Sequence, residues 1–92
     1  MAKGNKYDLS GAENVRFRDS SEGLFLRYGP LGTNGKPVYN TSILQKVISA
    51  DNAHIVFETL SGSWYRISRS QLPQSITAQL QIRNKFPEAF EI

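Results

Sequence analysis

The sequence predicts a small, mainly β domain: a strongly bent antiparallel sheet or an SH3-like half-open barrel of five or six strands, with a short C-terminal helix. Three observations predict this class. Short stretches of alternating apolar and polar residues recur along the 92-residue chain. Clusters of Gly, Pro, Asn, Asp and Ser separate them, and helical spacing returns after the last stretch. An α+β sandwich, with the terminal helix covering one face of the sheet, is the alternative.

The N-terminal segment, residues 1–14, contains few apolar side chains, and only Tyr7 and Leu9 can dock onto a core. We therefore expect a loosely held arm there. Residues 15–92 are expected to form one domain, because a chain of this length buries a single core of modest size.

Two short strands are predicted next, over residues 15–18 and 24–28, separated by the turn-forming segment 19–23. In both strands apolar side chains alternate with polar or aromatic ones, which is the period of a half-buried strand. The residues expected to face inward are Val15, Phe17, Leu24, Leu26 and Tyr28.

Segment 29–37 holds three glycines, two prolines and an Asn-Gly pair, a composition that predicts a loop long enough to serve in function. Its Gly29, Gly32, Gly35 and Lys36 do not have the spacing of a nucleotide-binding phosphate loop. An extended segment, 38–41, follows Pro37, so the loop also lacks the helix N-terminus of such a site.

Residues 42–50 fit two structures. Apolar residues fall at helical spacing, and Ser42 with Gln45 forms the pattern of a capping box. As a strand, the same stretch places Ile43 and Val47 on one face, with Leu44 and Ile48 on the other. We favour the strand, since residues 50–53 provide a turn into the following segment.

Residues 53–68 predict a β-hairpin, the strongest structural signal in the chain. Ile55 and Phe57 alternate with polar neighbours before the turn, Tyr65 and Ile67 do so after it, and Gly62 permits a tight connection.

Ser75 is then expected to cap a short helix that ends before Pro87. Its apolar residues Ile76 and Leu80 lie one turn apart, and a tail containing Phe86, Phe90 and Ile92 is expected to fold back onto the sheet.

Composition limits the setting and the chemistry. Eleven Lys and Arg residues against eight Asp and Glu give a net charge of +3, a weak preference for polyanions. The absence of cysteine excludes disulfides and thiolate metal sites and suits a cytoplasmic protein. No apolar run is long enough to span a bilayer or to act as the core of a signal peptide, so we expect no membrane association.

The residues give no indication of catalysis. His54, the only histidine, is expected on an outward strand face without a nucleophile or an orienting acid. Asp19 with Glu22, and Glu88 with Glu91, fall in turn or tail segments where nothing would raise their pKa. We therefore expect no enzyme, metal or cofactor.

The candidate site is an outward row of basic and aromatic side chains. If the strands alternate as predicted, these residues share the convex face, with Lys36 of the loop at its rim. Such a mixture stacks bases and neutralises phosphates, or anchors a protein interface. Alternatively, Trp64 and Phe25 lie beneath the C-terminal helix as a second small core. The row comprises Arg16, Arg18, Phe25, Arg27, Val56, Trp64 and Arg66.

Two motifs, Thr41-Ser42-Ile43-Leu44 and Thr59-Leu60-Ser61-Gly62-Ser63-Trp64-Tyr65, resemble a pattern in short proteins of phages and other mobile elements. The resemblance implies an accessory factor, such as an anti-CRISPR or other anti-defence inhibitor, and brings no catalytic residues. We therefore expect a non-enzymatic protein that binds and modulates a host protein or ribonucleoprotein. The alternative is a small barrel that binds RNA or single-stranded DNA through the basic aromatic row.

Overall fold

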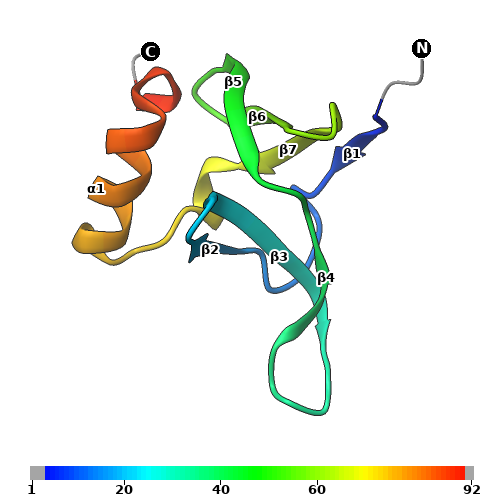
Figure 1. The fold of residues 1–92 in the computed structure, drawn as a ribbon. Helices are drawn as coiled ribbons and strands as arrows, with labels where there is room; N and C mark the ends of the chain where they lie inside the picture. Colours follow the sequence, from blue (N-terminus) through cyan, green and yellow to red (C-terminus); the bar gives the residue numbers. More distant parts are fainter. Residues whose placement is uncertain (1–3, 91–92) are drawn as a thin grey trace.

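The structure is a computed structural model that describes residues 4–90. Within this range seven strands form two sheets, and one α-helix follows the last strand (Figure 1). The fold is mainly β with a short helix near the C-terminus, which confirms the predicted class; over residues 4–90 the two sheets do not close into a barrel. The strands are β1 (Lys6–Asp8), β2 (Arg16–Ser20), β3 (Gly23–Leu31), β4 (Pro37–Asn40), β5 (Leu44–Ala50), β6 (His54–Thr59) and β7 (Trp64–Ser68).

The four-stranded sheet has the order β1-β7-β6-β5 and is built around the predicted hairpin. Strands β6 and β7 pair antiparallel, with Ile55 opposite Ile67 and Phe57 opposite Tyr65. Gly62 lies in the connecting turn with a φ of 87°, a conformation that side chains disfavour. The hairpin prediction is therefore confirmed.

Strand β5 confirms that residues 44–50 are extended, and it also explains the helical pattern of the sequence. Two irregularities in its pairing with β6 interrupt the alternation, one between Leu44 and Lys46 and one between Val47 and Ser49. Bulges of this kind add a residue between inward positions. Leu44, Val47 and Ala50 consequently all pack on the core, at a spacing of three that resembles a helix face.

The three-stranded sheet has the order β2-β3-β4. Its strand β3 continues through Gly29 and Pro30, so the prediction that the loop begins at Gly29 is wrong. Gly29 adopts a φ of 104°, and the β3–β4 register shifts between Tyr28 and Leu31. This bulge lets a glycine and a proline remain within a strand, and the loop itself spans only residues 32–36.

Residues 6–9 of the N-terminal segment are held more tightly than the sequence indicates. β1 pairs parallel with β7, with Tyr7 opposite Tyr65. Leu9 follows with 4% of its surface exposed, and its N–H donates to the Arg66 carbonyl oxygen at 2.7 Å. Parallel pairing joins residues far apart in sequence, which the composition of the segment does not reveal.

The C-terminal helix α1 (Ile76–Lys85) begins as predicted, because the Ser75 side chain accepts a hydrogen bond from the Ala78 N–H at 3.4 Å. Its last residue is Lys85, and the C-cap residue Phe86 stands immediately before Pro87. Two short 3-10 turns, η1 (Arg69–Gln71) and η2 (Pro87–Phe90), flank it. Ile92, part of the predicted tail, lies outside the described residues.

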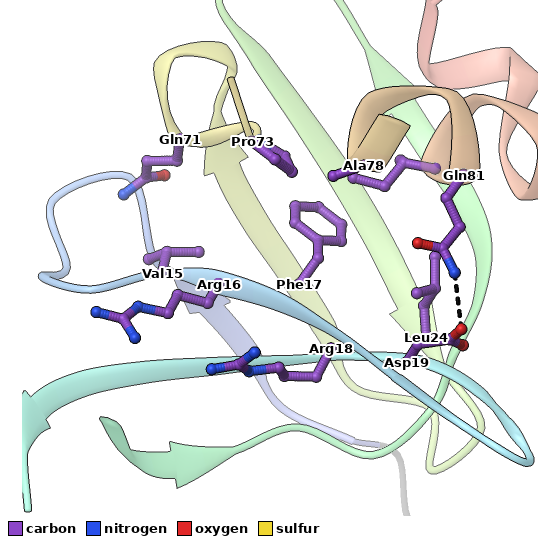
Figure 2. A pocket seen from close by; sticks show the side chains of 11 residues that line it. Val15, Arg16, Phe17, Arg18, Asp19, Leu24, Gln71, Pro73, Ala78 and Gln81 are labelled. Atoms are coloured by element: carbon purple, nitrogen blue, oxygen red, sulfur yellow. Dashed lines mark hydrogen bonds between the residues drawn. The ribbon is translucent and has the colours of Figure 1, made fainter. Parts of the chain in front are cut away.

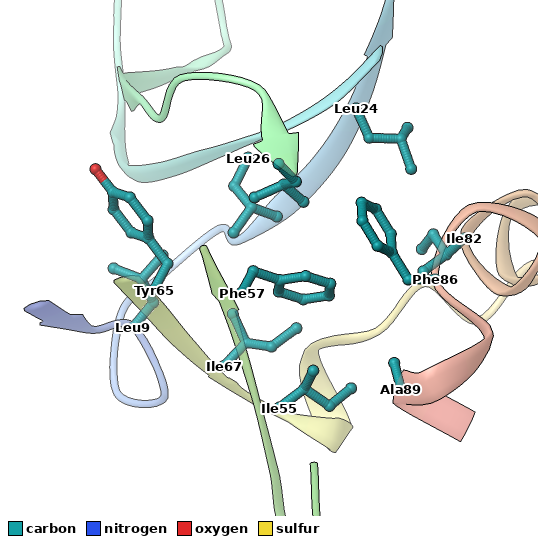
Figure 3. Packing of buried hydrophobic residues seen from close by; sticks show 11 residues of the cluster. Leu9, Leu24, Leu26, Ile55, Phe57, Tyr65, Ile67, Ile82, Phe86 and Ala89 are labelled. Atoms are coloured by element: carbon teal, nitrogen blue, oxygen red, sulfur yellow. The ribbon is translucent and has the colours of Figure 1, made fainter. Parts of the chain in front are cut away.

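The core lies between the two sheets and is closed by α1 (Figure 3). Phe57 is fully buried at its centre, with its ring centroid 5.9 Å from that of Phe17 and 5.2 Å from that of Phe86. Ile82 of α1 and Ala89 of η2 complete this end of the core. The helix therefore packs on the same core as the strands.

Candidate partner-binding surface

The two sheets divide the predicted outward row. Alternation correctly places these side chains away from the interior, but the prediction that they share one face is wrong. Alternation determines which side of its own sheet a residue occupies and says nothing about which sheet the strand joins. Arg16, Arg18, Phe25 and Arg27 lie on the outer side of the three-stranded sheet, whereas Val56, Trp64 and Arg66 lie on the outer side of the four-stranded sheet.

The first group, Arg16, Arg18, Phe25 and Arg27, is called the basic face. Arg16 stands directly opposite Arg27 on the neighbouring strand, and Arg18 stands opposite Phe25. The Arg27 guanidinium carbon lies 5.8 Å from the Phe25 ring centroid. The face therefore combines three cationic groups with one aromatic ring on two paired strands.

Within residues 4–90, no carboxylate forms an ion pair with the arginines of the basic face. The ion pairs within residues 4–90 join Lys46 to Glu58 and Arg66 to Asp8, and none involves an arginine of the basic face. The buried Nε of Arg27 also has no hydrogen-bond partner there. Like charges directly opposite each other destabilise a strand pair. An external anion placed between these guanidinium groups would relieve that repulsion.

The second group contains Trp64 and is already satisfied internally. The Trp64 indole N–H donates to the Glu58 carboxylate at 3.1 Å, and the other oxygen of Glu58 lies 3.4 Å from the Lys46 ammonium. The Lys6 ammonium lies 4.7 Å from the Trp64 ring centroid. Trp64 is thus half-buried, and the hollow beside it is lined by Gly4, Lys6, Glu58 and Gly62 and by no residue of α1.

Arg66 is likewise engaged on both sides. Its guanidinium lies 3.7 Å from the Asp8 carboxylate and 3.0 Å from the His54 Nε2. Hydrogen bonds from the side chain and backbone of Ser10 lower the pKa of Asp8, and the charge of Arg66 adds to this effect. Asp8 is therefore ionised at neutral pH and balances Arg66.

Lys36 lies apart from both groups. It ends the β3–β4 loop, where its N–H donates to the Asn34 side chain at 3.0 Å and its carbonyl oxygen accepts from the Gly32 N–H at 2.8 Å. Figure 1 shows this loop projecting from the body of the molecule. The structure does not bring Lys36 into contact with the basic face.

A groove of about 420 Å³ lies beside the basic face, between β2 and α1 (Figure 2). Phe17 points into it toward Pro73, whereas Arg16 and Arg18 point away from the helix at its rim. At one end the Gln81 side-chain amide donates to the Asp19 carboxylate at 2.7 Å and bridges the groove. Its lining comprises Val15, Arg16, Phe17, Arg18, Asp19, Leu24, Gln71, Pro73, Ala78, Gln81 and Ile82.

Neither the groove nor a second, more open hollow was predicted. The second hollow, of about 440 Å³, lies on the other side of the basic face, where Phe25 meets Ile43 and Leu60. Leu60 is 62% exposed, which leaves an apolar margin in the hollow that Phe25 also lines. Both hollows are formed by segments distant in sequence, so the sequence alone did not indicate that their lining residues come together.

No family model, curated protein or solved structure matches this chain.

All four tyrosines of the chain form a row that the sequence did not reveal. Tyr7 stacks on Tyr65 with ring centroids 4.8 Å apart, Tyr65 lies 6.4 Å from Tyr28, and Tyr28 lies 5.5 Å from Tyr39. Burial raises the pKa of Tyr28 and of Tyr65. The row links the two sheets, since β1 and β7 contribute two rings while β3 and β4 contribute the others.

Two features of residues 4–90 concern metal binding and acid chemistry. No group of three or more His, Asp or Glu side chains in this part of the chain is placed to hold a metal ion. The backbone N–H groups of His54 and Ala53 lower the pKa of Asp51, which keeps it ionised and unable to act as an acid at neutral pH. No described helix is long and apolar enough to cross a membrane.

Proposed function

We propose that this protein is a non-catalytic binding protein whose basic face holds an acidic surface of a protein partner and thereby blocks or modulates it. One observation carries the proposal: three guanidinium groups share the outer side of β2 and β3 with an aromatic ring, and none has a carboxylate partner within residues 4–90. The resemblance to phage accessory proteins implies the same class of role.

Several features favour a protein partner. Arginine and aromatic residues contribute a disproportionate share of binding energy in protein interfaces. The apolar hollows on either side of the basic face suit a surface with mixed chemistry. Asp19 and Glu22 lie near the β2–β3 turn, which confines the cationic groups to the two strands. The basic face is therefore a limited cationic patch with acidic residues at one end.

Single-stranded nucleic acid is the second candidate. The Phe25 ring, with Arg27 5.8 Å from its centroid, resembles the combination of stacking surface and cation that holds an unpaired base. The net charge of +3 is compatible with this partner. In this case the same basic face would bind, and the two candidates differ in ligand.

A charge-matched pair of double variants tests the basic face. Arg18→Gln with Arg27→Gln removes two charges from it, and Lys46→Gln with Arg66→Gln removes two from the Trp64 side of the other sheet. Wild type and the two variants are immobilised separately, and each is exposed to host lysate with and without nuclease. The proposal is supported by a partner whose binding persists after nuclease treatment, is retained by the Lys46/Arg66 variant and is lost in the Arg18/Arg27 variant. Equal retention by both folded variants would reject this face.

A labelled oligonucleotide separates the two candidate partners. Nucleic-acid binding predicts measurable affinity at low salt that falls steeply as salt rises, because each phosphate contact releases counterions. It also predicts that the Arg18/Arg27 variant binds more weakly and has a shallower salt dependence. Absence of binding at low salt would eliminate the second candidate and leave the protein partner in place.

A further inference from the structure

We infer that an extended acidic segment of the protein partner binds along β2 as an additional strand, seated in the groove between β2 and α1. The inference rests on the proposed function, since it identifies the part of the partner that meets the basic face. It follows from three features of β2: its free backbone edge, the groove on one side and the arginines on the other.

β2 is the outer strand of the three-stranded sheet, with β3 on one side only. Phe17 stands opposite Leu26, but Leu26 directs both backbone groups to the other neighbour. Its carbonyl oxygen accepts from the Thr41 N–H at 2.8 Å, and its N–H donates to the Thr41 hydroxyl at 3.0 Å. Phe17 and Leu26 are therefore a non-hydrogen-bonded pair, and the backbone N–H and carbonyl of Phe17 point to the open edge.

The same alternation makes Asp19 a second residue with backbone groups on the open edge. No other backbone group within residues 4–90 is hydrogen-bonded to Phe17 or Asp19 from that side. An exposed row of donors and acceptors is what an added strand requires. β2 therefore offers a template for backbone pairing next to a preformed groove.

The two sides of β2 specify the side chains of the added strand. Residues opposite Phe17 would point into the groove, where Phe17, Pro73 and Ala78 provide partly exposed apolar contacts. Residues in alternate positions would point to the outer side, next to Arg16 and Arg18, which lack ion-pair partners among the described residues. Cross-strand neighbours interact directly. The geometry thus selects an extended segment in which acidic and apolar residues alternate.

The hydrogen bond between Gln81 and Asp19 bridges one end of this groove. A strand that covers the whole of β2 must displace it. At the end near Val15 the Gln71 side chain donates to the Leu9 carbonyl oxygen at 2.7 Å, a contact that lies outside β2. Replacing Asp19 with alanine removes the bridge and retains the backbone N–H of residue 19. Replacing it with proline removes both, and proline is tolerated where the N–H faces away from the sheet.

The probe for this site is a capped peptide in which glutamate and valine alternate. Its length of about eight residues lies within the usual range for a strand. We expect it to bind wild type with NMR shifts concentrated in β2 and α1. Two controls have the same length: one with its glutamates and valines in separate blocks, and one with lysine in place of glutamate. Each should bind at least about tenfold more weakly, because neither matches both sides of β2. Equal binding of the three peptides would overturn the inference.

Backbone pairing is tested by methylating the peptide nitrogens, which leaves the protein unchanged. Only alternate residues of an added strand direct their N–H groups to β2. One peptide carries the methyl groups on its valines and another on its glutamates. Strand addition requires that one of them lose binding while the other retains it, and the sensitive set reports the direction of the strand. Equal behaviour of the two would overturn the inference.

Variants of the protein complete the test. Asp19→Ala should bind the alternating peptide at least as well as wild type, and Asp19→Pro about tenfold less well than Asp19→Ala, the effect of one lost backbone bond. Equal affinities of the folded variants would overturn the inference, and the methylated peptides decide if Asp19→Pro does not fold. If the peptides fail but the lysate partner still depends on Arg18 and Arg27, only the strand inference falls. Loss of that dependence removes the proposed function itself.

Discussion

Gly29 permits a direct test of how the tyrosine row is attached to the three-stranded sheet. Its φ of 104° lies in a region that side chains disfavour, and a Cβ atom there would lie 2.6 Å from a ring carbon of Tyr39. Alanine at this position therefore incurs backbone strain of about 1–3 kcal/mol. It also displaces the Tyr39 ring from Tyr28, a contact between aromatic rings of about 0.5–1.5 kcal/mol. We expect Gly29→Ala to lower the free energy of unfolding by about 1.5–4.5 kcal/mol.

Gly35 provides the matched control. Its φ is 76°, yet an added Cβ meets no atom within 4 Å, so Gly35→Ala should cost only the backbone term of about 1–2 kcal/mol. Urea unfolding followed by far-UV circular dichroism and Trp64 fluorescence measures both losses. In a Tyr39→Ala background, the cost of Gly29→Ala should fall toward that of Gly35→Ala. Equal costs in the wild-type background would refute the steric argument.

Three further results are expected. Phe57→Ala, which empties the centre of the core, should cost about 3–5 kcal/mol in urea unfolding, and Leu60→Ala, on the surface, less than about 0.5 kcal/mol; similar losses would contradict the packing. Ser10→Ala should raise the pKa of Asp8 toward 3.8 in an NMR titration, since Ser10 supplies the main hydrogen bonds. An unchanged pKa of Asp8 in the variant would contradict the role of Ser10. The contribution of Asp8 to stability is present above its unfolded pKa and is lost as pH falls through the lowered folded pKa. Burial should raise the pKa of Tyr65 above 10.0, as measured by ultraviolet absorbance during a pH titration. The contribution of Tyr65 to stability should then decline as pH rises past the unfolded pKa. A pKa of 10.0 in the folded protein would contradict its burial.

The sequence predicts best where structure depends on neighbouring residues. The β6–β7 hairpin follows from alternation around Gly62, and α1 begins at Ser75 because a hydroxyl can cap the first free N–H groups. In β5 the bulges interrupt the alternation of a regular strand, so the sequence fitted both a helix and a strand. The strand assignment still holds, because β6 pairs with the whole segment.

Long-range pairing explains the main differences. Nothing near Tyr7 indicates that it pairs with Tyr65, so β1 was not recognised as a strand. The outward direction of Trp64 and of Phe25 was predicted correctly, but their assignment to one surface required knowing how the strands divide between sheets. The groove beside Phe17 likewise depends on where a distant helix packs.

The arginines of β2 also govern how copies of this protein meet one another. Two copies pairing antiparallel through their β2 edges, centred on Phe17, would bring Arg16 of each against Arg18 of the other on the same side of the joined sheet. Repulsion between these cations opposes fibre-like assembly through an edge that is otherwise open. Concentrated salt screens that repulsion. Pairing of two copies through this edge is therefore expected to become more favourable as ionic strength rises.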